Sequence, residues 1–164
     1  MPLPHSFLTG AADWNSEGRS LVAAFEHGLD QQDLLCRELE DMADSLPGRL
    51  NTHQAVLLMG QLQLLLRRVH LLEETLVFPA LIAAHPDLSP VLDRLCAEHA
   101  EDEDHAVDLE EAIVAFGARS DAERVGYMMR GLFVGLRRHM AFERDHIQPL
   151  LRGFEQGRSS EASL

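Results

Sequence analysis

The sequence predicts an all-α protein with the architecture of an up-down-up-down antiparallel four-helix bundle. Apolar residues recur at helical spacing through most of the chain, and no stretch alternates apolar and polar residues as a strand does. Helix-breaking residues divide the chain into four long segments with short connections. Short connections make consecutive helices antiparallel, and four such helices pack most simply as a bundle.

Residues that start and stop helices set the bounds of the four segments. Pro47 ends the first segment and Pro86 ends the second. Ser89 followed by Pro90 is typical of a helix start, and a capping-box pattern begins at Ser120. The expected helices cover residues 16–45, 51–84, 89–117 and 120–153.

One domain is expected, because the chain is short for two and long enough to bury a sizeable core. We expect an N-terminal arm at residues 1–15, the bundle at 16–153 and a polar C-terminal tail at 154–164. The start lacks the basic end and apolar stretch of a signal peptide, and no apolar run approaches the roughly 18 residues of a membrane helix. These features predict a soluble cytoplasmic protein.

Acidic residues outnumber basic ones, with 27 aspartates and glutamates against 14 arginines and no lysine, for a formal net charge of −13. Such a surface repels phosphate backbones and anionic lipids, so neither nucleic acid nor a membrane is an expected partner. The two cysteines, Cys36 and Cys96, fit neither a disulfide framework nor a CxxC zinc pattern. We expect both to be buried thiols in a reducing compartment.

Two polar segments in the second and fourth expected helices resemble each other. HLLEETLVFPALI (70–82) aligns with HMAFERDHIQPLL (139–151), and in each a histidine is followed four residues later by a glutamate. That offset puts both side chains on one helix face. Two such pairs in alternate helices indicate a pseudo-twofold bundle of two hairpins, with the pairs facing inward. The pairs are His70 with Glu74 and His139 with Glu143.

The register of the second helix stays open between two glutamates. Pro79 follows its histidine by nine residues, whereas Pro149 follows by ten. Aligning the prolines places Glu73 on Glu143, whereas aligning the histidines places Glu74 there. Either carboxylate lies within reach of the inward face, since the two flank it on the helix.

The other helix of each hairpin offers one histidine at a matching height. Counting at about 1.5 Å per residue from the shared loops brings His27 and His99 level with the histidines of their partner helices. His105 falls about 9 Å out of that register and is expected at the surface. Buried imidazoles and carboxylates are costly without compensation, and a metal compensates them better than a network of waters. The candidate ligands are His27, His70, His99, His139, Glu143 and one of Glu73 or Glu74.

The ligand types indicate the metal. Imidazole and carboxylate suit iron, and also zinc or manganese. Few carboxylates among many imidazoles favour two bridged ions, one on each hairpin's pair of histidines. Glu143 and one of Glu73 or Glu74 would then bridge. Glu103 and His146 share faces with ligand histidines and are weaker candidates, since solvated or core positions are commoner for them.

The order histidine, HxxxE, histidine, HxxxE over four antiparallel helices resembles the hemerythrin-like, or HHE cation-binding, domains. The resemblance covers about residues 16–153 and includes the dipeptides Glu98-His99 and Phe78-Pro79. It implies a non-haem di-iron centre whose ligands match the six candidates, with Glu74 in the second helix. In that family the proline usually falls ten residues after the histidine, a spacing from which the second helix departs.

The resemblance also separates branches of the family. Oxygen-carrying hemerythrins have HxxxH in the third helix and an aspartate five residues after the histidine of the fourth. Glu103 and Arg144 stand at those positions here. A five-histidine oxygen carrier is therefore not expected. The set looks more like the branch with iron-centre repair and nitric-oxide response proteins and the iron- and oxygen-sensing domain of a eukaryotic F-box protein.

The expected function is that of a metal-binding protein that binds or senses O2, NO or iron. Beyond the ligands no proton-relay residue is identified, and Tyr127, the only tyrosine, lies about 18 Å along the helix from His139. The alternative is an oxidoreductase-like protein acting on peroxide or NO, or in iron-centre repair. Whether the protein is an enzyme, and which protein partner or oligomer it forms, the sequence leaves open.

Overall fold

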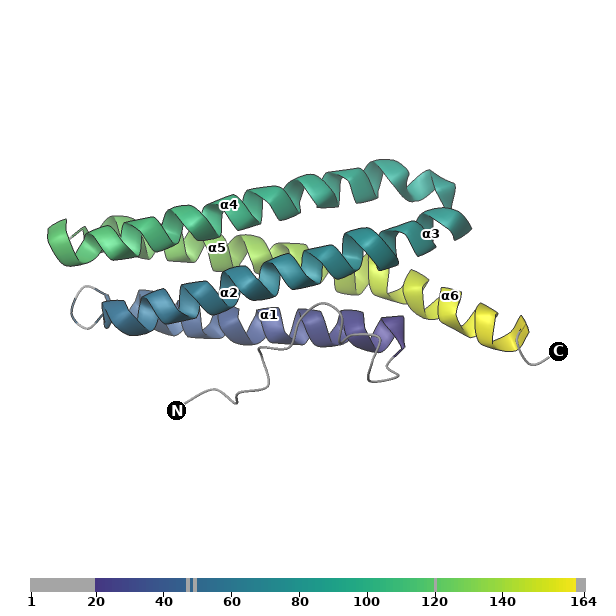
Figure 1. Ribbon diagram of the computed structural model, residues 1–164, viewed down its shortest axis with the longest axis horizontal. Coiled ribbons are helices and arrows are strands. Elements are labelled where there is room, and N and C mark those ends of the chain that lie inside the picture. Colours follow the sequence, from purple (N-terminus) through teal and green to yellow (C-terminus); the bar gives the residue numbers. More distant parts are fainter. Residues whose placement is uncertain (1–19, 47, 49, 120, 162–164) are drawn as a thin grey trace.

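The structure is a computed structural model that describes residues 20–161 except 47, 49 and 120. It confirms the all-α four-helix bundle (Figure 1). The expected N-terminal arm at 1–15 lies outside the described residues, as does Ser120. The elements are α1 (Leu21–Asp44), α2 (Thr52–Leu72), η3 (Glu73–Val77), α3 (Phe78–Ala84), η4 (Pro86–Leu88), α4 (Ser89–Arg119), α5 (Ala122–Phe142), η5 (Glu143–Ile147) and α6 (Gln148–Glu161).

Four long rods make the bundle, because η3 joins α2 to α3 and η5 joins α5 to α6 without a break (Figure 1). Helix α1 packs against α2 and α5, and α4 packs against the same two helices from the opposite corner. The sequence placed the end of the fourth rod near Gly153, but α6 continues to Glu161. Residues 154–161 are therefore helical and continue the fourth rod.

Side-chain caps fix where three of the rods begin. The Ser20 hydroxyl accepts a hydrogen bond from the Ala23 amide at 3.1 Å, and the Asn51 side chain accepts one from the Gln54 amide at 3.2 Å. Asp121 caps α5 in the same way. Each cap satisfies an amide that the first helical turn leaves without a partner, which stabilises a helix by about 1 kcal/mol.

The two hairpins repeat each other at an interval of 70 residues. Both π-helices begin at a glutamate, Glu73 and Glu143, and a proline follows six residues later in each copy. The buried positions repeat at the same interval along all four rods. Pairs of buried residues 70 positions apart include Phe25 and Leu95, Leu39 and Leu109, Ala43 and Ile113, Met59 and Met129, Leu62 and Leu132, and Leu66 and Leu136.

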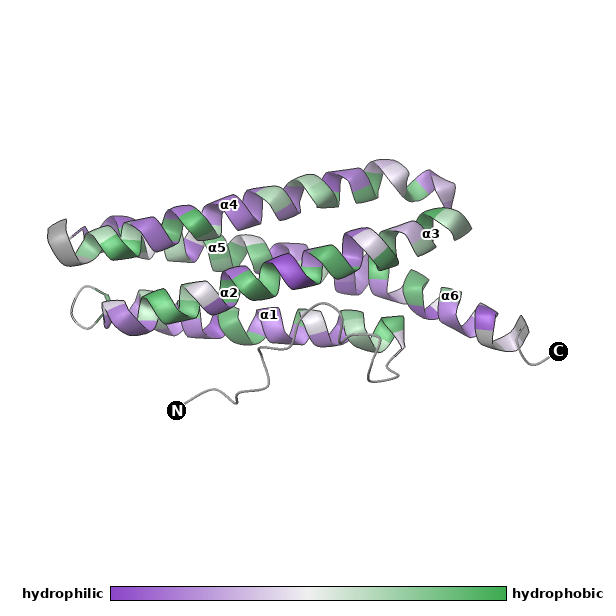
Figure 2. Ribbon diagram, viewed as in Figure 1, coloured by the Kyte–Doolittle hydropathy of each residue, from purple (hydrophilic) through white to green (hydrophobic). Residues whose placement is uncertain are grey.

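One rod has the length and composition of a membrane-spanning helix, contrary to the expectation that no apolar run approaches that size. In Thr52–Ala84 the most apolar 18-residue window has a mean hydropathy of 1.3, and half of that window is buried. The core helix of a bundle has the same character, and α2 packs on both α1 and α4 (Figure 2). Burial inside the bundle accounts for the apolar composition of this rod.

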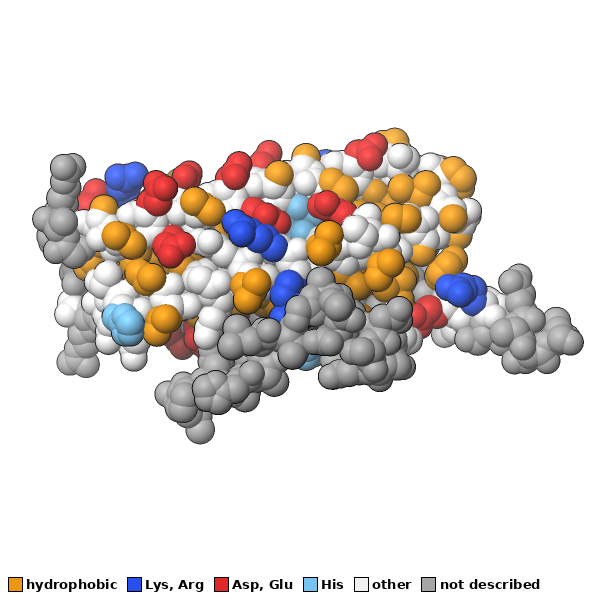
Figure 3. Space-filling model, viewed as in Figure 1, with side chains coloured by type: hydrophobic (Ala, Val, Ile, Leu, Met, Phe, Trp, Pro, Cys, Tyr) orange, Lys and Arg blue, Asp and Glu red, His pale blue; other side chains and the backbone are white. Residues whose placement is uncertain are grey.

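Charged side chains are unevenly placed on the surface. Acidic groups gather along α4 in Figure 3. Arginines of the fourth rod instead pair with acidic residues of α1. Arg137 donates to Glu40 at 2.8 Å and Arg144 to Asp30 at 3.2 Å. Exposed pairs of this kind stabilise the fold by about 0–1 kcal/mol each, so the apolar core supplies most of the stability.

Candidate metal centre

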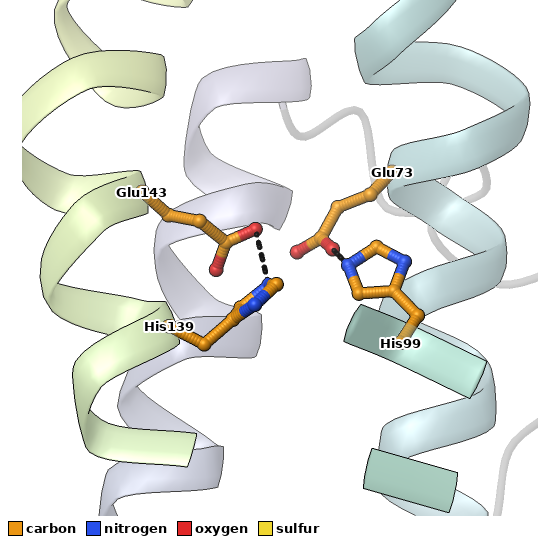
Figure 4. A group of neighbouring side chains, drawn as sticks. All are labelled: Glu73, His99, His139 and Glu143. Atoms are coloured by element: carbon orange, nitrogen blue, oxygen red, sulfur yellow. Dashed lines mark ion pairs between the residues drawn. The ribbon is translucent and has the colours of Figure 1, made fainter. Parts of the chain in front are cut away.

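Two histidines and two glutamates from three of the rods meet inside the bundle. Glu73 comes from η3, His99 from α4, His139 from α5 and Glu143 from η5 (Figure 4). One ligand atom from each of the four lies within 4.8 Å of the others. All four residues are buried, and both glutamates are 0% exposed. Acids this deeply buried require compensation by a proton or a cation.

The polar atoms that face this cluster have no hydrogen-bond partner among the described residues. They are both carboxylate oxygens of each glutamate and the Nε2 atom of each histidine. His99 Nε2 lies 3.1 Å from Glu73 and His139 Nε2 lies 3.3 Å from Glu143, without hydrogen-bond geometry. Each buried polar group without a partner costs about 1–3 kcal/mol. A cation bound between them would compensate the buried carboxylates and accept the lone pairs of the imidazoles.

A carboxylate holds the outer nitrogen of each cluster histidine. His99 Nδ1 lies 2.8 Å from Glu74 Oε1, and His139 Nδ1 lies 3.0 Å from Glu98 Oε2. A neutral imidazole that donates from Nδ1 presents the lone pair of Nε2 on its other side, toward the cluster. Metal-binding histidines are commonly oriented by such a carboxylate. The donor set and its supporting groups therefore fit a metal ion.

The two glutamates occupy the first position of a π-helix each. The amide of Phe78 donates to the carbonyl of Glu73, and the amide of Gln148 donates to that of Glu143, five residues back in both cases. A π-helical turn takes an extra residue into an otherwise regular helix, and such turns occur often at functional sites. The identical placement in both hairpins gives the carboxylates equivalent positions on opposite rods.

Burial and neighbouring charges shift the pKa values within the cluster. Burial raises the pKa of Glu73 well above its usual range, and the nearby Glu143 carboxylate raises it further. Burial lowers the pKa of His139, but the carboxylates of Glu143, Glu98 and Glu73 outweigh this effect and raise the pKa to about 9. In the metal-free centre, Glu73 and His139 thus hold protons, and a bound cation would displace these protons.

His70 lies beside the cluster but is not a member of it. Its ring stacks on that of His99 with centroids 3.9 Å apart and an interplanar angle of 5°. Its Nδ1 lies 2.8 Å from Glu103 Oε1. Burial, with the neighbouring imidazoles of His99 and His139, lowers the pKa of His70 to about 2, so the ring is neutral.

The structure brings together three of the six sequence candidates, namely His99, His139 and Glu143, and places His70 against them. It does not bring in Glu74 or His27. Glu74 is exposed and orients His99, whereas Glu73 faces the cluster. Glu73 is the glutamate that matches Glu143 when Pro79 is aligned with Pro149, one of the two alignments that the sequence left open. The extra residue in the π-helical turn η3 places Glu73, and not Glu74, on the inward face. His27 is exposed on α1 because its neighbours Phe25 and Leu29 turn inward.

The weaker candidates lie outside the cluster. His146 is exposed with its ring 4.6 Å from that of Phe142. His105, which the helix register placed at the surface, is instead half-buried close to Gly131. Glu103 is the partner of His70. The supporting roles of Glu74, Glu98 and Glu103 were not predicted, because a run of acidic residues does not reveal which members turn toward a neighbouring helix.

These features define the class of protein, a helical bundle with a buried histidine and glutamate centre suited to a metal. The family model described as the hemerythrin HHE cation binding domain matches residues 24–151, which is most of the chain. The chain belongs to this family, as its residue pattern indicated, and the family is one of metal-binding helical proteins. Comparisons with curated proteins and with solved structures give no significant match.

Proposed function

We propose that this protein binds iron at the buried centre and uses it to bind or sense a small ligand such as O2 or NO. The observation that carries the proposal is the group of four converging buried side chains whose inner atoms lack partners. Two imidazoles and two carboxylates suit Fe(II), and also zinc or manganese. When bound, iron supplies redox chemistry and open coordination positions for a small ligand. The native metal and its ligand remain part of the proposal.

Binding is favoured over turnover by the surroundings of the centre. Tyr127, the only tyrosine of the chain, is 79% exposed. The thiol of Cys36 is buried, and burial raises its pKa to about 12, so it is not a reactive group. Leucine, valine and phenylalanine side chains fill most of the adjoining core. Such walls restrict water near the ion.

The test is metal content and optical spectrum of untagged protein purified without oxygen. We expect iron to co-purify and the spectrum to change on exposure to air or NO. The Glu143→Gln variant should lose the metal, because it removes a buried anionic ligand. The Glu101→Gln variant makes the same change at an exposed position of α4 and should keep it. Metal-free wild-type protein that fails to take up Fe(II) contradicts the proposal.

A further inference from the structure

We infer that the centre holds one metal ion, and that apolar side chains close the position where the pseudo-twofold repeat would place a second. This inference rests on the proposed metal binding and departs from the two-ion centre that the family resemblance implies. It concerns only the number of ions that the residues of this chain can hold.

The repeat identifies which residues would serve a second ion. The cluster histidines of the α4 and α5 hairpin are His99 and His139, and the residues 70 positions earlier are Leu29 and Val69. Both are buried, with exposures of 1% and 0%. The two glutamates are retained in both copies, but both imidazoles are replaced by aliphatic side chains in the α1 and α2 hairpin. An aliphatic side chain offers a metal no lone pair.

Neither His27 nor His70, the two histidines nearest these positions in the first hairpin, restores the missing ligands. His27 is two residues from Leu29 and is exposed. His70 is one residue from Val69, and its counterpart in the repeat is Met140. Among the described residues, the only group of three or more histidine, cysteine, aspartate or glutamate side chains that meets at metal-binding distance is the one that contains Glu73. His70 does not belong to it.

The close packing of α1 and α2 and the charge of the centre also argue against a second ion. A Cβ added at Gly28 would lie 3.1 and 3.3 Å from the two methyl groups of Val69, so α1 and α2 are in close contact beside the unused position. As metal ligands, the carboxylates of Glu73 and Glu143 would carry two negative charges, which match the charge of one divalent cation. A second divalent ion would have to rely on Glu74, Glu98 and Glu103 for its charge compensation, and these carboxylates already contact the outer nitrogens of His99, His139 and His70. Gln32, the amide that α1 buries, is neutral.

Metal stoichiometry tests the inference. Metal-free protein is titrated with Co(II) without oxygen, and bound metal is measured per chain after gel filtration. We expect one ion per chain for the wild type and for His27→Ala. The double variant Leu29→His/Val69→His restores both missing imidazoles and should bind two. A matched control, Leu34→His/Leu71→His, places the same two imidazoles on exposed positions of α1 and α2 and should still bind one.

The outcomes separate this inference from the proposed function. Two ions per wild-type chain would overturn the single-ion inference and leave metal binding intact. Zero ions would overturn metal binding itself. Loss of the ion in His27→Ala would show that α1 supplies a ligand, and so would also contradict the inference. A folded double variant, checked by circular dichroism, that binds only one ion would contradict the role of Leu29 and Val69.

Discussion

At the scale of single residues, Glu73 shows how the centre lowers the stability of the folded protein when no cation is bound. Its carboxyl group is fully buried, both oxygens lack hydrogen-bond partners, and its pKa is raised well above the usual range by burial and by Glu143. The folded metal-free protein therefore retains a proton there that the unfolded chain releases. Such a group destabilises the fold as the pH rises above its ordinary pKa of 4.5.

Replacing Glu73 by glutamine should remove that penalty. We expect metal-free Glu73→Gln to be as stable as the metal-free wild type at pH 5, and more stable by about 1 kcal/mol at pH 7. The wild type loses stability between these values because its unfolded state binds fewer protons than its folded state. Urea unfolding of both proteins at the two pH values measures the difference.

The same variant should lose its response to metal. Added Fe(II) should stabilise the wild type without oxygen and leave Glu73→Gln almost unchanged. Glu74→Gln is the control, because that residue only orients His99, and it should weaken the response without abolishing it. A metal-free Glu73→Gln protein that is clearly less stable than the wild type at pH 7 would mean that the carboxylates form a structural network.

At the scale of elements, the sequence predicts the helices well, but it predicts only in part which residues of each helix face the centre. Helical spacing and breakers gave four rods, since burial imposes a period that the sequence displays directly. The choice between Glu73 and Glu74 depended on η3, whose extra residue leaves no mark in hydrophobic spacing. The proline at a constant distance from each glutamate was the signal that could have decided it.

The structure does not bring His27 to the cluster, for a related reason. Counting rise per residue from loop ends locates height to within about two residues, because helix ends are uncertain by that much. Two residues along a helix amount to a rotation of about 200°, which turns an inward side chain outward. The repeat of 70 residues is free of this error, and it selects Leu29 as the inward residue.

The contact between α1 and α2 can be tested at Gly28. Gly28→Ala gains helix propensity of about 1 kcal/mol but forces a methyl group against Val69, whose branched side chain has little freedom in a helix. We expect a net destabilisation of about 1 kcal/mol, since overpacking a core costs about 1–3 kcal/mol. Urea unfolding measures it.

Gly60 provides the matched control on α2. A Cβ added there meets nothing within 4 Å, so Gly60→Ala should stabilise the protein by about 0.5–1 kcal/mol. Opposite signs for the two alanine variants would show that α1 and α2 are locked at the height of the centre. Equal stabilisation by Gly28→Ala and Gly60→Ala would mean that α1 and α2 move apart easily near Gly28. There would then be space for a second ion, contrary to the single-ion inference.

At the scale of the whole molecule, the centre ties together three of the four rods. Its four residues come from η3 on the second rod, α4 on the third, and α5 with η5 on the fourth, and none of the four lies on α1. The chain has a formal net charge of −13, and in the metal-free bundle only protons compensate the two buried carboxyl groups. A bound divalent ion relieves part of this repulsion and joins rods that are distant in sequence.

Metal binding should therefore raise the melting temperature of the whole bundle. At a free concentration about 100 times Kd, a ligand that binds only the folded state stabilises it by about 2.7 kcal/mol. For a domain of this size that corresponds to a rise in Tm of roughly 5–10 °C. Calorimetry without oxygen, with and without Fe(II), measures the rise. Mg2+ at the same concentration should give almost none, because it prefers an all-oxygen shell to imidazole.

Glu143→Gln should remove the iron-dependent rise, since it leaves the ion without one of its two neutralising charges. An equal rise in that variant would place the stabilising ion elsewhere, for which the acidic surface of α4 is the region to examine.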